Sequence, residues 1–382
     1  MAETGALLEV QDLKVYYPGA ADRGGPRRPV RAVDGVSLAL GEDETLGLVG
    51  ESGSGKTTLI KAVLRLLPAG AQVASGRVLW RGRDLLTLPR RELRRLRWRE
   101  LALISQSAMN SLDPVYRVGA QIAEAILAHE PGRHRAQKRA GELLSRVGLQ
   151  PSRARDYPHQ LSGGMKQRVA IAMAIALDPA LIVADEPTTA LDVIVQAQIL
   201  DEILRLLSSR RGSLILVTHD ISVVAQTCRR VAVMYAGRIV EQGETAEVFE
   251  RPAHPYTMGL KNAFPSISGE RRGLVYVPGF PPDPADPPPG CRFAPRCPFS
   301  QPACGRDDPP TAVLGGRQVA CHLADDADRL RRKASEPSTW RLRAPAGGPV
   351  APPPPEGAGA RRPGAQVPRA AGLDRTGGGM WG

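Results

Sequence analysis

The 382-residue sequence has few aromatic residues and no long apolar run. Aromatic residues make up 4% of it, and the longest uninterrupted apolar run, Val169–Leu177, is far shorter than the roughly 20 residues that cross a bilayer as a helix. The first residues, MAETGALLEVQDL, lack a basic segment followed by an apolar one, so we expect no secretory signal. Export and membrane-spanning roles are therefore not expected, whereas 42% hydrophobic residues suffice for a buried core.

Lysine is scarce although the chain is basic. Only seven of the 51 basic residues are lysines, and the formal net charge is +12. An arginine-rich composition explains a general excess of this kind, while the run Arg90–Arg99, with six arginines, could face phosphates. We interpret this run as a solvated helix face, so nucleic acid is not an expected partner.

Cysteine is also scarce, and four of the five cysteines form a cluster. Cys228 stands alone and is expected to be buried as a small apolar residue. The other four lie within 31 residues and have no C-x2-C pair, which weakens a zinc-finger interpretation. Because a chain without a secretory signal does not usually keep disulfides, the cluster indicates metal ligation by Zn²⁺ or a [4Fe–4S] cluster. The four expected ligands are Cys291, Cys297, Cys304 and Cys321.

Residues 8 to about 262 alternate buried strand signals with helical periodicity. Three short apolar runs, Thr45–Val49, Leu181–Ala184 and Leu214–Val217, predict parallel strands covered on both faces. Polar residues follow each run, at the sheet edge where ligands bind in open parallel sheets. From about residue 88 to 178 the pattern is mostly helical, which predicts an inserted helical subdomain.

The composition changes after residue 273. Residues 273–290 are proline-rich and predict extended, irregular backbone. Residues 344–382 contain 8 Pro, 10 Gly and 8 Ala in 39 positions, so we expect that tail to be largely disordered.

The segment GESGSGKT, residues 50–57, matches the phosphate-loop pattern G-x-x-x-x-G-K-[ST] between a predicted strand and a predicted helix. Its glycines allow backbone N–H groups to point at phosphate oxygens, and the helix directs its positive end at the same anions. Lys56 is placed to reach the β- and γ-phosphates and the Thr57 hydroxyl to ligate Mg²⁺. The predicted nucleotide-binding residues here are Gly50, Ser52, Gly53, Ser54, Gly55, Lys56, Thr57 and Thr58.

The predicted strand at Leu181–Ala184 leads into two acids. Asp185 can hold Mg²⁺ through water, and Glu186 can polarise a water for attack on the γ-phosphate. Paired with the phosphate loop, these acids predict ATP hydrolysis.

The segment LSGGMKQR, residues 161–168, resembles the signature of ABC-type ATP-binding subunits. Ser162 can cap the following helix, and Gly163 and Gly164 permit close approach of a phosphate. The resemblance implies that the signature binds the nucleotide held by an opposite subunit. Two cassettes would then sandwich two ATP molecules, and one chain alone would be an incomplete enzyme.

The remaining motifs of that family are present in order. Gln106 resembles the glutamine that senses Mg²⁺ and water and couples to the membrane partner. Asp192, in TALD, resembles the loop that crosses the dimer interface, and His219 resembles the switch histidine at the γ-phosphate. Tyr17 resembles the aromatic residue that stacks on adenine, although Tyr16 could be confused with it.

The resemblance narrows after residue 250. The segments HPYT at 254–257, VPG at 277–279 and PGCRFAPRCP at 289–298 resemble the C-terminal extension of dipeptide and oligopeptide importer ATPases. Members of that family carry an iron–sulfur cluster held by four such cysteines, so we prefer [4Fe–4S] to Zn²⁺, with local stability as its purpose. The resemblance covers residues 8 to about 325.

The expected fold is α/β: a P-loop NTPase of the ABC ATPase type with a RecA-like parallel core, an antiparallel β portion, a helical subdomain and a Cys-rich C-terminal extension. The expected boundaries are 8–262 for the ATP-binding domain, with its helical subdomain at about 107–178. The extension follows at 263–325, and the largely disordered tail at 326–382.

The resemblance implies an ATPase that powers import of dipeptides or oligopeptides, working peripherally at the cytoplasmic face of the bacterial inner membrane. It implies as partners a second ATPase subunit, preferably a paralogue, two transmembrane permeases and an extracytoplasmic solute-binding protein. Two alternatives are weighed: import of nickel or another small solute, and a soluble ABC ATPase acting on nucleic acid.

Overall fold

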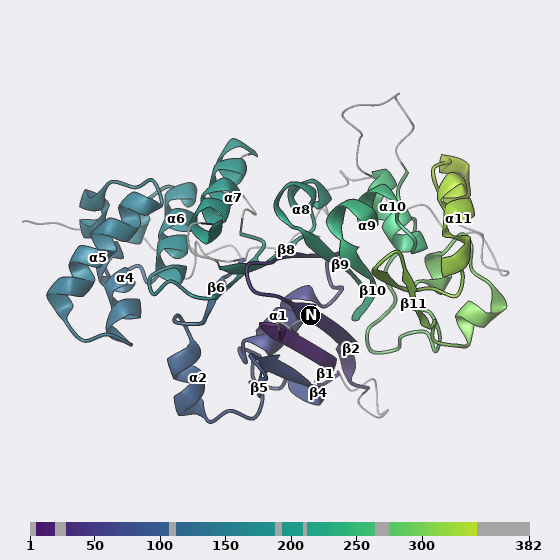
Figure 1. Ribbon diagram of the computed structural model, residues 1–382, viewed down its shortest axis with the longest axis horizontal. Coiled ribbons are helices and arrows are strands. Elements are labelled where there is room, and N and C mark those ends of the chain that lie inside the picture. Colours follow the sequence, from purple (N-terminus) through teal and green to yellow (C-terminus); the bar gives the residue numbers. More distant parts are fainter. Residues whose placement is uncertain are drawn as a thin grey trace, which may run out of the picture. The chain divides into compact units, whose positions relative to one another are not determined.

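The computed structural model describes residues 5–19, 28–106, 112–187, 193–208, 212–263 and 275–341. Every described residue belongs to one compact unit of the chain. That unit contains two β-sheets with helices packed around them (Figure 1). None of its described helices is long and apolar enough to span a membrane.

The larger sheet has the strand order β11-β12-β10-β9-β3-β8-β7-β6. Neighbouring strands from β9 to β6 run parallel, and β10, β12 and β11 add an antiparallel edge. The strands predicted from the three apolar runs are confirmed as β3, β7 and β8. The bounds are β3 Thr45–Val49, β6 Leu101–Ile104, β7 Leu181–Asp185, β8 Ser213–Thr218, β9 Arg230–Tyr235, β10 Arg238–Glu244, β11 Thr311–Leu314 and β12 Arg317–Ala320.

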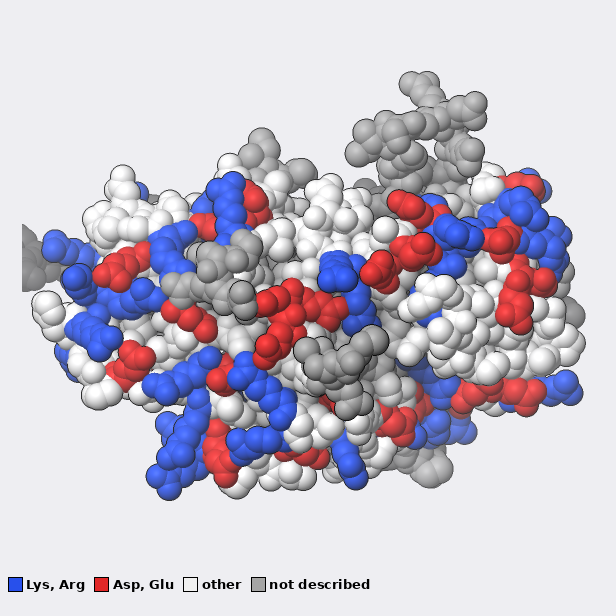
Figure 2. Space-filling view, in the orientation of Figure 1, with Lys and Arg blue, Asp and Glu red and all other residues white. Residues whose placement is uncertain are grey.

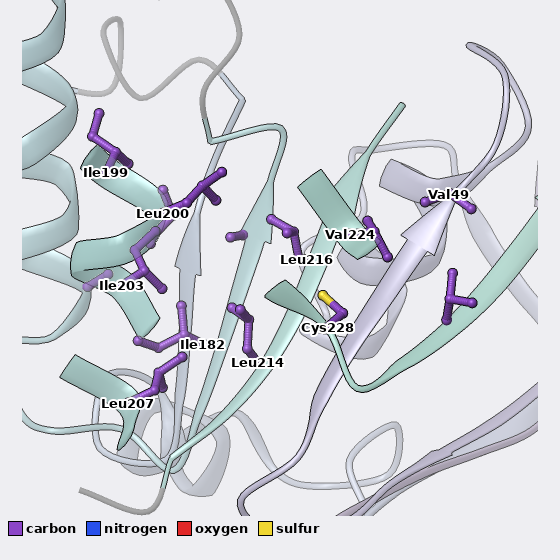
Figure 3. Packing of buried hydrophobic residues seen from close by; sticks show 14 of the residues in the cluster. Val49, Ile182, Ile199, Leu200, Ile203, Leu207, Leu214, Leu216, Val224 and Cys228 are labelled. Carbon is purple, nitrogen blue, oxygen red and sulfur yellow. The ribbon is translucent and has the colours of Figure 1, made fainter. Parts of the chain in front are cut away.

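Helices α7 (Val193–Ser208) and α8 (Ile221–Thr227) pack on one face of this sheet. Ile199, Ile203 and Leu207 recur every four residues, so they share one face of α7, and Figure 3 shows Ile203 and Leu207 near Ile182 of β7. Cys228, beside α8, is buried as expected at 6% exposure, and burial raises the pKa of its thiol to about 11.

The smaller sheet is antiparallel, with the order β2-β1-β4-β5, as the sequence predicted for the N-terminal part. Its apolar residues share a second core with α1 and with the β3 side chains Leu46 and Leu48. The phosphate loop therefore leads into a helix that is fixed by this core. The bounds are β1 Leu8–Tyr17, β2 Val30–Leu40, β4 Gln72–Trp80, β5 Arg83–Asp84 and α1 Lys56–Val63.

The region between β5 and β7 is mainly helical, with β6 as its described strand. Helix α2 presents Arg90, Arg91, Arg94 and Arg95 to solvent, as interpreted from the sequence. Figure 2 shows basic side chains gathered over α2, and basic and acidic ones interspersed elsewhere on the visible face. The helices are α2 Arg90–Leu96, α4 Val118–Leu127, α5 Arg133–Arg146 and α6 Gly163–Ala174.

The C-terminal part of the described chain contains helices α9 (Thr245–Glu250), α10 (Pro255–Ala263) and α11 (Ala327–Ala334). Here the structure differs from the expected tail, because residues 326–341 are folded. Leu330 and Trp340 are 1% and 4% exposed, and the Trp340 indole N–H donates to the Ala334 carbonyl at 2.8 Å. The burial of these two side chains anchors a segment whose charged side chains are mostly exposed. Residues 342–382 lie outside the described residues.

Candidate functional site

Four neighbouring parallel strands end at one edge of the larger sheet, in the order β3-β8-β7-β6. Gly50 follows β3, His219 follows β8, Glu186 follows β7 and Gln106 lies two residues after β6. In the sheet register Val49 lies opposite Thr218, and Asp185 lies opposite Val217. The motif residues therefore gather because their strands are adjacent and parallel.

The phosphate loop is held tightly against its neighbours. A Cβ atom at Gly50 would lie 2.1 Å from the Met234 carbonyl oxygen, and one at Gly55 would lie 2.1 Å from the Ala32 carbonyl oxygen. Gly55 also has a φ of 101°, in the region that favours glycine. These two positions therefore admit no side chain without moving the loop.

Lys56 folds back over this loop. Its ammonium group donates to the carbonyl oxygens of Gly50 at 2.8 Å and Glu51 at 2.9 Å, and the residue is 6% exposed. Burial lowers the pKa of Lys56, while the carboxylates of Glu186 and Asp185 act to raise it. A buried cation with backbone carbonyls as partners can transfer these contacts to the phosphate oxygens of a nucleotide.

The first turn of α1 faces the end of β7. The Thr57 hydroxyl donates to an Asp185 carboxylate oxygen at 3.3 Å. Burial raises the pKa of Asp185, and the hydrogen bond from Thr57 opposes that rise. A hydroxyl and a carboxylate side by side are oxygen donors of the kind that Mg²⁺ prefers, so these two residues fit that ion.

Gln106, Glu186 and His219 form one hydrogen-bonded group. The Gln106 side-chain amide donates to Glu186 Oε2 at 2.8 Å, and His219 Nδ1 lies 3.4 Å from Glu186 Oε1. Glu186 has a φ of 45°, a conformation uncommon for a residue with a side chain, and its N–H donates to the Val217 carbonyl at 2.8 Å. The turn after β7 thereby aims this carboxylate toward the neighbouring motifs, where it can orient a water molecule.

The two candidate adenine-stacking tyrosines have different surroundings. The Tyr17 hydroxyl lies 3.2 Å from the Thr58 hydroxyl, next to the phosphate loop. The Tyr16 hydroxyl donates to Asp34 at 2.7 Å. Tyr17 is therefore the tyrosine tied to the predicted nucleotide site.

The signature residues Ser162, Gly163 and Gly164 lie at the N-terminus of α6. Ser162 is the N-cap of α6 and its hydroxyl accepts the Met165 N–H at 3.3 Å, as the sequence predicted. Ser162 is exposed, whereas Gly163 and Gly164 are half-buried. The hydrogen bonds that gather Gln106, Glu186 and His219 do not include these three residues. Asp192, the remaining predicted nucleotide ligand, lies outside the described residues.

The four clustered cysteines line one small apolar hollow, together with His254 and Phe293. Backbone N–H groups reach three of the sulfurs: those of Phe293 and Ala294 at Cys291, Phe299 at Cys297, and Leu323 at Cys321. All four thiols are free, and within the described ranges no group of three or more ligand side chains is arranged to hold a metal ion.

Glu51 in the phosphate loop and Arg296 in the C-terminal extension are two residues without a role predicted from the sequence. Glu51 pairs with Arg296, and the Glu51 N–H donates to the Tyr256 hydroxyl at 2.9 Å. The available signal was the acid itself, because a carboxylate within an anion-binding loop calls for a cationic partner.

Comparisons with known proteins agree with this geometry. A family model described as ABC transporter matches residues 33–189, and one described as oligopeptide/dipeptide transporter, C-terminal region, matches residues 240–304. The dipeptide transport ATP-binding protein DppD of Caldanaerobacter subterraneus is 41% identical over 329 residues, covering 85% of this chain and 99% of its own. The DppD protein of Escherichia coli is 43% identical over the same length and coverage.

Two solved structures are similar in fold. One is a dimeric, post-hydrolysis structure of the ATP-binding cassette MJ0796 bound to ADP and Pi, with a TM-score of 0.55 and 26% identity. It covers 62% of this chain and 98% of its own. The other is cbiO1 of Clostridium perfringens, part of the ABC transporter complex cbiONQ, with a TM-score of 0.53 and 26% identity over 64% of this chain and 91% of its own.

Proposed function

This chain belongs to the ABC transporter family of ATP-binding proteins, and on that premise we propose that it hydrolyses ATP to power the import of dipeptides or oligopeptides. The observation that carries the proposal is the convergence of the phosphate loop, Gln106, Glu186 and His219 at one sheet edge. The match of residues 240–304 to the oligopeptide/dipeptide transporter region supports peptides over nickel or another small solute.

In this proposal the phosphate loop binds the nucleotide. Backbone N–H groups of residues 50–55 hold the phosphates, Lys56 exchanges its carbonyl partners for phosphate oxygens, and Tyr17 stacks on adenine. Thr57 and Asp185, with Gln106, would hold Mg²⁺. When bound, the ion supplies positive charge that neutralises the phosphates.

Glu186 is the proposed general base. Its carboxylate, oriented by the Gln106 amide, accepts a proton from the attacking water, and His219 contacts the γ-phosphate. The contacts of Glu186 with Gln106 and His219 support this assignment, because they place its carboxylate among the other motif residues.

The signature is proposed to complete the pocket of another cassette. Ser162 is exposed at the N-terminus of α6, where a helix end can meet the phosphates of a nucleotide held by a second molecule. Asp192 is assigned to the same interface by the sequence alone. The second cassette is proposed to be a paralogous ATPase subunit, with a homodimer as the other outcome.

The chain is proposed to act at the cytoplasmic face of the inner membrane, bound to two permease subunits near Gln106 and served by an extracytoplasmic solute-binding protein. The names of its relatives as transport proteins support this assembly. The proposed boundaries are 8–262 for the ATP-binding domain, with its helical subdomain at about 107–178. The extension begins at 263 and, because residues 326–341 are folded, reaches 341 rather than 325.

A [4Fe–4S] cluster, with Zn²⁺ as the alternative, is proposed for Cys291, Cys297, Cys304 and Cys321. The shared apolar hollow supports one common ligand site for the four sulfurs. Burial raises the pKa of Cys291, Cys297 and Cys321, so thiolates there would need the positive charge of a bound metal, and the backbone N–H groups at these sulfurs act in the same direction as that charge. The group would cross-link a proline-rich segment that has little core of its own. Anaerobic purification should yield iron and visible absorbance that air removes; stoichiometric zinc without iron would overturn the cluster.

Transport itself tests the function. The chain is assembled with its permeases in proteoliposomes, and uptake of a labelled dipeptide is followed with the solute-binding protein present. ATP should drive accumulation in the intact complex, and Lys56→Ala in this chain should abolish it. Uptake of nickel but not of peptides would refute the substrate class. Salt-dependent DNA binding without permease association would favour the nucleic-acid alternative.

A further inference from the structure

The C-terminal extension contacts the phosphate loop at Glu51, the residue that follows Gly50. Arg296, which directly precedes Cys297, donates to both Glu51 carboxylate oxygens, at 2.8 Å to Oε2 and 3.1 Å to Oε1. The side chains of Arg296 and Glu51 are 6% and 27% exposed. This is a bidentate arginine–carboxylate pair, buried on the arginine side and partly exposed on the glutamate side, and its two parallel hydrogen bonds fix the relative orientation of the groups.

All five N–H donors of the Arg296 guanidinium have acceptors. Besides the two Glu51 oxygens, they reach the Pro278 carbonyl at 2.9 Å, the Val277 carbonyl at 3.1 Å and the Tyr235 hydroxyl at 3.2 Å. The guanidinium also lies over the Tyr235 ring, 5.7 Å from its centroid. One rotamer of Arg296 therefore satisfies the whole group, so its position is fixed by the surrounding structure.

The backbone of Glu51 is also hydrogen-bonded on both sides. Its N–H donates to the Tyr256 hydroxyl at 2.9 Å, and its carbonyl oxygen accepts the Lys56 ammonium at 2.9 Å. Tyr256 belongs to the HPYT segment of α10 and packs against the Tyr235 ring at a centroid distance of 4.6 Å. Two segments that the sequence singled out, around residues 254–257 and 289–298, thus meet at one residue of the phosphate loop.

The charge of Glu51 gives this contact a consequence for ATP. A carboxylate in the phosphate loop repels an anionic nucleotide unless a cation offsets it, and the charge of Glu51 already acts on Lys56, whose pKa burial lowers and this charge tends to raise. Arg296 supplies that cation and turns the carboxylate toward the extension.

We propose that Arg296 is a positioning residue for ATP binding, acting through Glu51 to fix the start of the phosphate loop and to keep an unpaired negative charge from the nucleotide. This inference rests on the proposed ATP site. It also gives the extension a role in the nucleotide site. The sequence does not indicate this role, because Arg296 and Glu51 are 245 residues apart.

The test is a double-mutant cycle on the full-length chain, with the dissociation constant for MgATP as the readout. Arg296→Gln is expected to weaken binding at least tenfold, equivalent to about 1.4 kcal/mol. The double variant Arg296→Gln with Glu51→Gln should bind within threefold of Glu51→Gln alone, because no unpaired charge remains. Arg317→Gln, which removes another buried arginine of the extension, should bind ATP as the unmodified chain does.

Arg296 also donates to the Val277 and Pro278 carbonyls, so its loss could weaken ATP binding only by disturbing the extension. Recovery of MgATP affinity in the Glu51→Gln background separates the two roles, because that substitution does not restore the contacts to these carbonyls. Equal weakening by Arg296→Gln in both backgrounds would overturn the proposal, as would unchanged affinity. Should Arg296→Gln fail to fold, Arg296→Met, which also removes the charge and is of similar length, is carried through the same cycle with the same expected and contradicting outcomes.

Kinetics add a second readout. In the assembled transporter Arg296→Gln should raise KM for ATP while kcat at saturation stays within twofold; a fall in kcat with unchanged KM would count against a binding role. Lys56→Ala distinguishes the two levels of failure. If the unmodified chain binds MgATP no better than Lys56→Ala, the proposed function fails. If the unmodified chain binds MgATP and Arg296→Gln binds it with the same dissociation constant, only this inference fails.

Discussion

Replacing Glu186 by glutamine should nearly abolish ATP turnover while leaving the fold intact. Glutamine has the same shape, tolerates the same backbone conformation and can still pair with the Gln106 amide, which lies 2.8 Å from the carboxylate. What it loses is the ability to accept a proton. General-base catalysis contributes about 10²- to 10⁴-fold, so kcat should fall by that factor, or roughly 3–5 kcal/mol in activation free energy.

The assay is release of inorganic phosphate by the assembled transporter at saturating MgATP, with the MgATP dissociation constant measured in parallel. The dissociation constant should stay within a few-fold, and the variant should accumulate as an ATP-bound closed dimer. Glu44→Gln is a matched control, because Glu44 is similarly shielded, at 14% against 17% side-chain exposure, but pairs with Arg230. A kcat within threefold of the unmodified chain would refute the assignment of Glu186 as base.

Three further outcomes follow from individual contacts. Thr57→Val should raise the Mg²⁺ concentration for half-maximal ATPase activity at least tenfold, and Thr57→Ser should restore it, since only the hydroxyl beside the Asp185 carboxylate differs. Gly50→Ala should eliminate measurable MgATP binding and lower the free energy of unfolding by about 2 kcal/mol or more, because its Cβ would meet a backbone carbonyl at 2.1 Å; Gly305→Ala, with open space around its Cβ, should do neither. Burial raises the pKa of Cys228 from 9.0 to about 11, so the stability that depends on its neutral thiol is present below pH 9 and is lost between about pH 9 and 11. Urea unfolding should show that the free energy of unfolding falls by roughly 3 kcal/mol more over this range in the unmodified chain than in Cys228→Ala. A pH profile identical in both proteins would contradict this last prediction.

The parallel core could be predicted from the sequence because each strand is a short local signal. The runs Thr45–Val49 and Leu214–Val217 are continuous and apolar, as expected for strands covered on both faces, and they correspond to β3 and β8. The gathering of Glu186 and His219 then follows from the adjacency of parallel strand ends.

Other features depend on contacts between distant segments and could not be predicted in this way. No pattern in the neighbouring sequence indicates that Arg296 pairs with Glu51, because the pair forms only when the extension packs on the phosphate loop. The same holds for Trp340, whose burial folds a segment that looks polar and tail-like in the sequence. Composition is a poor guide to whether a polar segment folds, because the burial of one or two apolar side chains can decide it.

The central claim is that two cassettes complete each other's ATP sites, with Ser162 of this chain facing a nucleotide bound by its partner. It can be tested with a photoreactive ATP analogue that carries its reactive group on the γ-phosphate, in a complex where Lys56→Ala disables this chain's own phosphate loop. The label should still attach to the segment at Ser162, because the nucleotide bound by the other cassette delivers it. Labelling of that segment only when Lys56 is intact, or no labelling at all, would contradict it.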